Sequence, residues 1–290
     1  MKVGIVGCGT LGSAIGERLL DQNCELLVWN RSVIRNTRIA SAALIGASPR
    51  EVAERADVTL SLVAGEHANQ AVYTGADGLL AAGPARLIVN LSTLSPAVFR
   101  DLAAAAAERS IAFIECPVLG TAAPARQGLL VALAAGDEQA IARAEPALKL
   151  FCRAVCSVGR PGAGAAMKLV HNTLLTLYWR ATGEAFDFGR ASGLALDTMI
   201  EVIGDSFAAV QQWPLKMRVL RGEDVAAGFT LGNLENEIKL QRGLFEQAGV
   251  ACPMLDLTLD RVSAAIKDGW RERDVAALGL YQPRSGELRD

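Results

Sequence analysis

A lysine, a histidine and an asparagine lie close together in an otherwise apolar stretch, "GAGAAMKLVHNTLLTLYW", at residues 162–179. Lys168 and Asn172 are one helical turn apart and His171 lies three residues after the lysine, so a helix would place all three on one side. Partial burial lowers the pKa of an ammonium group, and a lysine in such surroundings can donate a proton to the oxygen or nitrogen of a double bond whose carbon receives a hydride. The amide of Asn172 could orient the substrate.

Each of these residues also has a purely structural interpretation. Lys168 could extend along apolar surface to reach water at the start of a helix. His171 could be a hydrogen-bonded structural histidine. Periodicity alone leaves both interpretations open.

A second candidate site lies near the N-terminus, in "VGIVGCGTLGSAIG". Gly7, Gly9 and Gly12 form a G-x-G-x-x-G pattern between a strand signal and a helix signal, which is typical of dinucleotide binding. Thr10 and Leu11 lie at the positive end of the expected helix, where a phosphate would bind. These five residues are therefore candidate cofactor ligands, with a tight turn that binds nothing as the alternative.

The residues after the second expected strand indicate which nicotinamide cofactor is bound. Asn30 stands about 20 residues after the glycine loop, where NAD-binding proteins carry the carboxylate that holds the ribose 2′-hydroxyl. No acidic residue is present there, and Arg31 and Ser32 offer a guanidinium and a hydroxyl to a 2′-phosphate. The pattern favours NADPH (NADP+) over NADH, although Arg31 could also be a solvated surface charge.

The first half of the chain alternates short strand-like runs with alanine-rich, polar-faced segments. Spacings of roughly 20 to 30 residues suit crossover helices, which predicts a parallel α/β sheet. The expected strands are "KVGIVG", "ELLVWN", "VTLSLV", "RLIVNLS", "AFIECPV" and "LLVALAAG". After "SVGRPGAG" the pattern becomes helical. We predict a Rossmann NADP-binding domain over residues 1–162, an all-α substrate and dimerisation domain over 163–290, and a long interdomain helix from about residue 164.

The long helix is expected to carry an apolar stripe with spacings of three and four residues and to end at Gly193. The members of the stripe are Met167, Val170, Leu174, Leu177, Ala181, Ala185 and Phe188. Further helices are predicted near 196–204, 231–248 and 255–268. An apolar helix of this length indicates that a second subunit covers part of the surface, so we expect a homodimer through the helical domain.

Composition excludes several classes of function. A net charge of −2 provides no attractive field for nucleic acid or an anionic membrane, so a small molecule is the expected partner. The six cysteines contain no C-x-x-C pair and the chain has two histidines, so no metal site is expected. No secretory signal or membrane-spanning run is visible, and we expect a cytoplasmic protein.

Four stretches together resemble the β-hydroxyacid dehydrogenase family, which includes 3-hydroxyisobutyrate dehydrogenases and glyoxylate/succinic semialdehyde reductases, with 6-phosphogluconate dehydrogenase and the imine reductases as relatives. They are "GIVGCGTLGSAIGERLL", "NLSTLSP", "FIECPVLGTAAPARQGLLVALAAGD" and "VGRPGAGAAMKLVHNTLL". The resemblance spans nearly the whole chain and implies an NAD(P)-dependent oxidoreductase. It makes Lys168 the general acid/base, with Asn172 holding the substrate.

The resemblance also implies roles for residues in the connecting loops. It places Leu62, Val63, Ser92 and Thr93 beside the cofactor. Thr93, with Gly120 and Thr121 of the third stretch, would also orient the substrate. "KLVHN" is similar to the 6-phosphogluconate dehydrogenase motif, in which the histidine touches substrate, so His171 becomes a candidate as well.

Two departures from the family pattern bear on the substrate. Leu119 stands where the family has a serine that helps bind the substrate carboxylate. "LENEIKL" has Asn236 and Glu237 where the family has a lysine and an aspartate, with the lysine on the cofactor side of the cleft, so Asn236 takes the cofactor position. Both changes weaken the case for a short anionic substrate.

Three functions remain open. The first is reduction of a semialdehyde or hydroxyacid-type carbonyl, and the second is reduction of a C=N bond in an apolar cleft, as in imine reductases. Phe207 and Trp213 in "FAAVQQWPLKM" would suit an apolar substrate, although aromatic residues at helical spacing more often form core. The third is a catalytically inactive NADP-binding protein.

Overall fold

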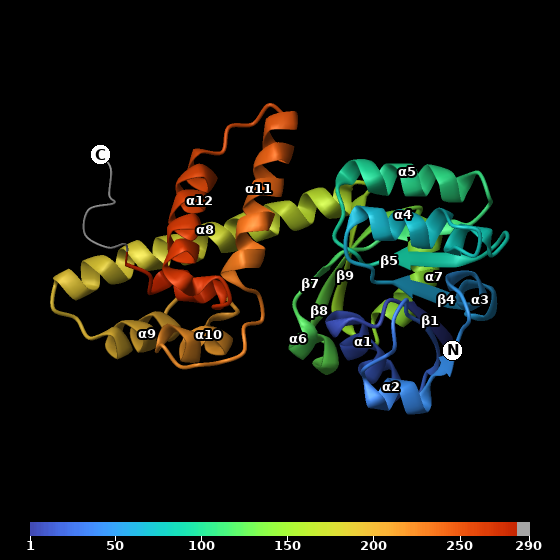
Figure 1. Cartoon of the computed structure of the whole chain (residues 1–290), viewed down its shortest axis with the longest axis horizontal. Helices are drawn as coiled ribbons and strands as arrows, with labels where there is room; N and C mark the ends of the chain where they lie inside the picture. Colours follow the sequence, from blue (N-terminus) through green and yellow to red (C-terminus); the bar gives the residue numbers. More distant parts are fainter. Residues whose placement is uncertain (283–290) are drawn as a thin grey trace. The chain divides into compact units, whose positions relative to one another are not determined.

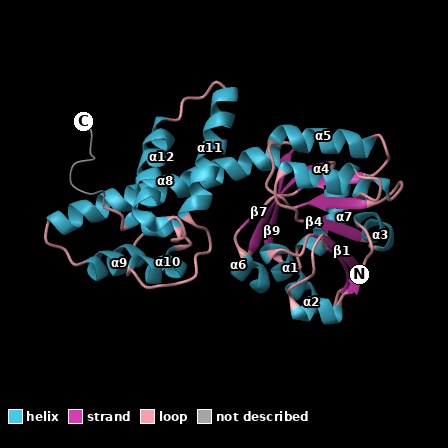
Figure 2. Cartoon of the chain, viewed as in Figure 1, coloured by secondary structure: helices cyan, strands magenta, loops and turns pink. Residues whose placement is uncertain are grey.

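The computed structural model describes residues 1–282. The chain divides into two compact units, Met1–Lys168 and Leu169–Asp290, each treated by itself below. Strands and helices mix in the first unit, and the second is helical (Figures 1 and 2). The predicted boundary after residue 162 remains a prediction.

A nine-stranded sheet forms the centre of the first unit, in the order β3-β2-β1-β4-β5-β6-β8-β7, with β9 pairing with β8. The strands are β1 Lys2–Val6, β2 Glu25–Trp29, β3 Leu44–Ile45, β4 Val58–Ser61, β5 Leu87–Asn90, β6 Ala112–Glu115, β7 Val118–Leu119, β8 Leu130–Gly136 and β9 Cys152–Gly159. The pairs among β1 to β6 are parallel. This order and direction confirm the predicted Rossmann arrangement.

The expectation of an all-parallel sheet was wrong beyond β6. β8 pairs antiparallel with β6, and β7 pairs antiparallel with β8. β9 pairs parallel with β8 but was not predicted, because half of its residues are exposed and it lacks the apolar alternation of an inner strand. β3 and β7 are two residues each, too short to give a pattern.

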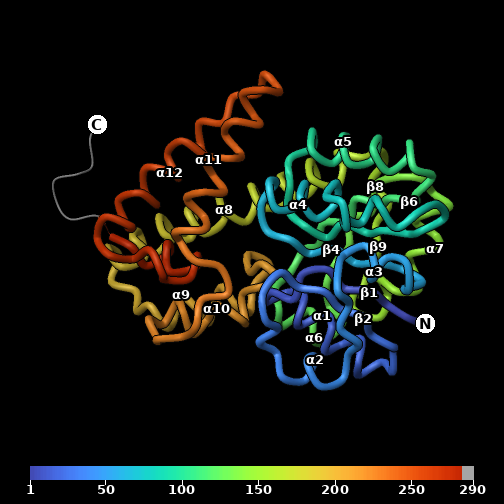
Figure 3. The backbone as a smooth tube through the Cα atoms, turned by 45° about the vertical axis from the view of Figure 1, so that its right-hand side comes forward, coloured from blue at the N-terminus to red at the C-terminus, as the bar shows by residue number. Residues whose placement is uncertain are grey.

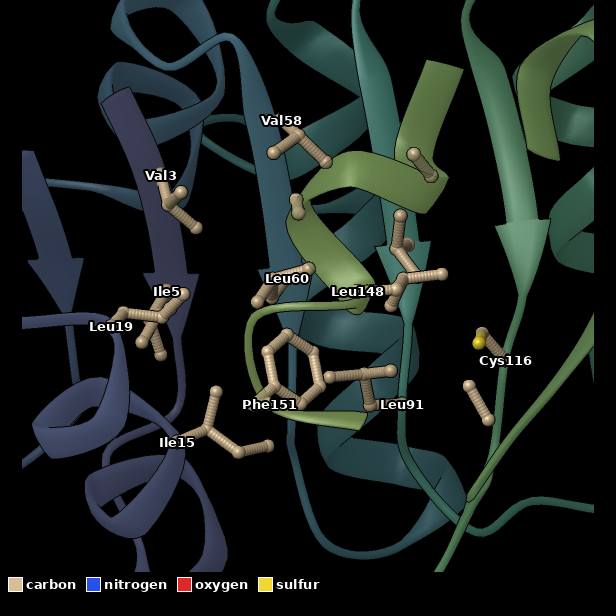
Figure 4. Close-up of a cluster of buried hydrophobic side chains, with 14 of the residues drawn as sticks. Val3, Ile5, Ile15, Leu19, Val58, Leu60, Leu91, Cys116, Leu148 and Phe151 are labelled. Carbon is tan, nitrogen blue, oxygen red and sulfur yellow. The ribbon is translucent and has the colours of Figure 1, made fainter. Parts of the chain in front are cut away.

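Alternating side chains of the strands supply two separate cores. Val3 and Ile5 of β1 face the helices α1 (Thr10–Asp21) and α7 (Glu138–Leu148), as Figure 4 shows for the cluster around Phe151. Helices α2 (Thr37–Ala42) and α6 (Ala122–Gln127) add to this face. Val6 points the other way, since strand residues alternate between faces. There it packs with α3 (Pro49–Arg55), α4 (Glu66–Thr74), α5 (Pro96–Ala107) and the 3₁₀ turn Leu79–Ala81.

The second unit is built on α8 (Ala163–Ala191), a helix that begins in the first unit. The others are α9 Leu196–Gly204, α10 Trp213–Leu220, α11 Leu231–Gln247 and α12 Pro253–Ala265, followed by a π-helical turn Ile266–Trp270 and a 3₁₀ turn Val275–Gly279. α11 and α12 form a hairpin (Figure 3). α9, α11 and α12 agree with the prediction, whereas α10 was not predicted, although Pro214 in its first turn is typical of a helix start.

The core-facing side of α8 differs from the apolar stripe read in the sequence. Leu174 and Phe188 of that stripe are 66% and 75% exposed, whereas Trp179 and Phe186 are fully buried. Gly189 lies on the buried side as well, where a Cβ would come within 2.1 Å of Met199 Sδ. Close contact through small residues, together with two large aromatic side chains, therefore determines which face packs. The helical spacing of apolar residues in the sequence indicates neither the close contact at Gly189 nor the burial of the two aromatic side chains.

None of the helices within residues 1–282 combines the length and apolar character that a membrane span needs. In the same residues, no group of three or more His, Cys, Asp and Glu is arranged to hold a metal ion.

Candidate active site

The glycine loop between β1 and α1 has two positions where a side chain cannot fit. Gly7 has φ of +106°, and a Cβ there would lie 2.3 Å from the carbonyl oxygen of Leu62. A Cβ on Gly12 would lie 2.0 Å from the carbonyl oxygen of Gly7. Gly7 therefore allows the tight turn after β1, and Gly12 allows α1 to pack closely against that turn.

Gly9 differs from the other two, because a Cβ built on it meets no atom of the protein within 4 Å. It is the residue before α1, and the N–H groups of the first helical turn, including those of Thr10 and Leu11, lack intrahelical acceptors. Open space at the positive end of a helix fits a dinucleotide pyrophosphate. The residues present thus suit a nicotinamide dinucleotide.

A cavity of about 360 Å³ adjoins this loop and reaches the end of β2. Its lining includes Gly7, Gly9, Trp29, Asn30, Arg31, Ser32, Leu62 and Val63, so most of the predicted cofactor residues surround one space. The Asn30 side chain links its two sides: Oδ1 accepts from Cys8 N at 3.0 Å, and Nδ2 donates to Ser32 O at 2.9 Å. Asn30 therefore fixes the loop that presents Arg31 and Ser32.

A buried polar network joins the loops that follow β4 and β5. Ser92 Oγ accepts from Val63 N at 3.1 Å and donates to Asn69 Oδ1 at 3.2 Å. Asn69 Nδ2 also donates to Val63 O at 2.6 Å, and Asn90 Oδ1 accepts from Ser92 N at 2.9 Å. Ser92 thus holds the loop containing Val63. Sequence analysis predicted Ser92 and Val63 but missed Asn69 and Asn90; a polar residue ending the buried strand β5 was the available signal for Asn90.

Lys168 lies within reach of two oxygen atoms of the first unit. Its Nζ donates to Thr93 Oγ1 at 2.8 Å and to the carbonyl oxygen of Val118 at 3.3 Å. Thr93 follows β5 and Val118 opens β7, so the ammonium lies where these two connections meet. An ammonium and a hydroxyl in hydrogen-bond contact are suited to stabilise an oxygen and to pass it a proton.

Gly120 and Thr121 come directly after β7. Gly120 has φ of +120°, and a Cβ on it would lie 2.6 Å from Leu130 Cδ2, so this turn requires glycine. Thr121 is the residue before α6. The structure thus places both in the connection that starts beside Val118.

The remaining predicted residues lie in the second unit. Asn172 Nδ2 donates to Glu237 Oε1 at 2.6 Å, and its Oδ1 lies 2.9 Å from His171 Nδ1. An amide oxygen can only accept, so this contact needs the proton on Nδ1 of the histidine. Gln241 Nε2 also donates to Glu237 Oε1, at 3.0 Å. Glu237 therefore orients the Asn172 amide, whereas Asn236 is exposed on α11.

The two aromatic residues considered as substrate contacts have different environments. Trp213 is 1% exposed, stacks on Trp179 at 6.1 Å between ring centroids, and donates through Nε1 to Ile200 O. It belongs to the core of the second unit. Phe207 is fully exposed.

The sheet order, the glycine loop and the cavity define the first unit as a dinucleotide-binding Rossmann domain. Residues 2–159 match the sequence family described as the NAD binding domain of 6-phosphogluconate dehydrogenase. Residues 162–281 match the family described as NAD-binding of NADP-dependent 3-hydroxyisobutyrate dehydrogenase. The chain belongs to the β-hydroxyacid dehydrogenase family and is an NAD(P)-dependent oxidoreductase.

Individual relatives have similar length. The NAD-dependent L-serine dehydrogenase of Pseudomonas aeruginosa is 28% identical over 99% of each chain. The structure of Psf3 in complex with NADP+ and 2-OPP is 27% identical, with a TM-score of 0.84 over 96% of this chain and 99% of that one. An imine reductase from Myxococcus stipitatus in complex with NADP+ is 20% identical, with a TM-score of 0.62 over 97% and 99%, and shows a shared fold alone.

Proposed function

We propose that this protein is an NADPH-dependent reductase that transfers a hydride to the carbonyl carbon of a small semialdehyde or hydroxyacid-type substrate, with Lys168 as proton donor. The hydrogen bond of 2.8 Å between Lys168 Nζ and Thr93 Oγ1 carries the proposal. It places an ammonium and a hydroxyl together at the carboxyl edge of a dinucleotide-binding sheet, where ligands of such sheets bind.

The chemistry divides between cofactor and chain. When bound, the nicotinamide cofactor supplies the hydride. Lys168 donates a proton to the carbonyl oxygen, which becomes a hydroxyl, and the neutral amine then regains a proton from water. The Thr93 hydroxyl, held at Nζ, orients the ammonium toward the substrate oxygen, with Gly120, Thr121, His171 and Asn172 as further substrate residues.

The assignment of NADPH is supported by the residues that line the cavity at the end of β2. Asn30 is neutral and its side chain is already engaged by the backbone of Cys8 and Ser32. Arg31 and Ser32 are exposed on the lining, and the loop that carries them has no acidic residue, while Asp77 of another segment also lines the cavity. A 2′-phosphate would therefore meet a guanidinium and a hydroxyl.

A second candidate, reduction of a C=N bond, is favoured by Leu119. This residue pairs with Val131 at the end of β7 and presents an alkyl side chain where the family serine would offer a hydroxyl. Loss of one hydrogen bond to a charged group costs about 1.5 to 3 kcal/mol, or roughly ten- to a hundredfold in affinity for a carboxylate.

The two candidates make different predictions for substrate class. NADPH oxidation is followed with glyoxylate and succinic semialdehyde, and in parallel with uncharged cyclic imines and ketones. We expect turnover of the acids, at a KM that Leu119→Ser lowers by roughly tenfold, because the serine restores a hydroxyl donor. Turnover of the uncharged imines and ketones alone would contradict reduction of a carbonyl acid and favour reduction of a C=N bond.

For its assembly we propose a homodimer. The support is the exposed apolar stripe of the second unit, in which Leu174 and Phe188 are 66% and 75% exposed. Solvent exposure of large apolar side chains on one helix is unfavourable, and a second copy of the chain would cover them. Light scattering coupled to size exclusion should then report twice the chain mass of 30.6 kDa.

A further inference from the structure

Glu115 is a buried carboxylate for which the proposed chemistry has no use. It ends β6, is 0% exposed, and is enclosed by the start of α8. Its Oε2 accepts a hydrogen bond from Gly162 N, and its Oε1 accepts one from Ala165 N at 2.5 Å. Burial raises the pKa of this carboxyl group, while the N–H groups of Gly162, Ala165 and Gly164 and the charge of Arg100 act in the opposite direction.

The contact is built into the backbone on both sides. Gly162 has φ of +98°, which turns the chain into the helix. A Cβ on Gly164 would lie 2.9 Å from Glu115 Oε1 and 2.9 Å from the carbonyl oxygen of Leu133. Glycine at position 164 therefore lets the first turn of α8 approach the carboxylate. The oxygen atoms of Glu115 replace the carbonyl partners that these N–H groups lack at a helix start.

Lys168 lies one turn beyond Ala165 on the same helix. Its Nζ must meet Thr93 Oγ1 and the Val118 carbonyl oxygen, which lie on loops after β5 and at β7. Rotation or translation of the first turn would move Nζ away from both. Glu115 is in the next strand of the same sheet, so it ties the helix start to the scaffold that carries Thr93.

We infer that Glu115 is a positioning residue, which anchors the first turn of α8 and thereby sets the location of Lys168 Nζ against Thr93 Oγ1 and Val118 O. The expected effect of Glu115 on catalysis rests on the proposed role of Lys168 as proton donor. The effect of Glu115 on the position of Lys168 Nζ does not depend on that role. Glu115 itself touches neither the reacting atoms nor the cofactor cavity.

The geometric part is tested without any substrate, by the rate at which acetic anhydride acetylates Lys168 relative to Lys239 of α11, read by mass spectrometry. An ammonium held by two oxygen atoms reacts slowly, so Glu115→Gln and Glu115→Asp should raise the relative rate at Lys168 several-fold. The matched control is Asp137→Asn. Asp137 Oδ1 accepts a hydrogen bond from Ala140 N at 2.9 Å at the start of α7, a helix that carries no candidate site residue. Asp137→Asn should therefore leave the relative acetylation rate of Lys168 unchanged.

The catalytic part is read from NADPH oxidation with glyoxylate, with Lys168→Ala as reference. Glu115→Gln should lower kcat by roughly ten- to a hundredfold and leave the Kd for NADPH unchanged, since a displacement of about 1 Å of a reacting group can cost about a hundredfold. Glu115→Asp, which keeps the charge, should recover part of kcat.

The outcomes separate the two claims. Labelling of Lys168 that is unchanged in both Glu115 variants would overturn the inference, whatever Lys168→Ala does. A Lys168→Ala variant with normal turnover would instead overturn the role of Lys168 as proton donor, while altered labelling would still establish Glu115 as its anchor.

Discussion

Asn30 and Arg31 occupy adjacent positions after β2 but contribute to cofactor recognition in different ways. Asn30 joins the glycine loop to the Ser32 backbone through both ends of its amide. Arg31 lines the cavity with an exposed guanidinium. Selectivity between the two nicotinamide dinucleotides should therefore depend on the charge at one position and on loop geometry at the other.

We expect Arg31→Ala to weaken NADPH binding by roughly ten- to a hundredfold and to leave NADH binding nearly unchanged, because it removes a charged hydrogen bond to the 2′-phosphate alone. Fluorescence titration of each cofactor gives both Kd values. Arg38→Ala is the control, since Arg38 pairs with Asp21 on an exposed surface. An equal loss of affinity for both cofactors would show that Arg31 does not bind the 2′-phosphate.

At the scale of elements, the three glycines of the first loop serve two distinct purposes. Gly7 and Gly12 are required by contacts within the protein, whereas the space beside Gly9 is open. Gly9 has φ of −71° and ψ of −165°, which other residues adopt without strain. A methyl group at Gly9 should therefore impair cofactor binding, whereas one at Gly12 should impair folding.

Gly9→Ala should fold with an unfolding free energy close to that of the original chain yet lose most of its affinity for NADPH, because the methyl group enters the space of the pyrophosphate. Gly12→Ala should lower the unfolding free energy by about 1 to 3 kcal/mol through overpacking against Gly7 O. Chemical denaturation and cofactor titration measure the two quantities. Full NADPH affinity in Gly9→Ala would place the pyrophosphate elsewhere.

The sequence predicts those elements whose residue types are dictated locally. The glycine loop, six strands and the helices α9, α11 and α12 follow from turn chemistry and periodicity, and so does the candidacy of Lys168. Glu115 and Asn69 could not be predicted in this way. Their partners, at Gly162 and at Ser92, come from distant segments that only the folded sheet brings together.

For the whole molecule, the second unit has a core of its own, which centres on Trp179, Trp213 and Phe186. Trp213 and Phe207, two aromatic residues of one short segment, test the importance of this core, since both were candidate substrate contacts. Trp213 is 1% exposed, whereas Phe207 is fully exposed.

Trp213→Ala should lower the unfolding free energy by about 3 to 5 kcal/mol, because it leaves a large cavity and removes the hydrogen bond to the Ile200 carbonyl oxygen. Phe207→Ala, its matched control, should change it by less than about 0.5 kcal/mol. Denaturant unfolding followed by circular dichroism measures both. A larger loss for Phe207→Ala than for Trp213→Ala would contradict the packing described for the second unit.

We propose above that Lys168, held at Thr93, donates the proton during reduction. The most direct test is kcat for NADPH oxidation by Lys168→Ala, with the Kd for NADPH measured on the same sample. A general acid contributes about 10² to 10⁴-fold, so kcat should fall within that range while the Kd stays the same. A kcat within a few-fold of the original, at unchanged Kd, would contradict the account and assign the proton to another donor.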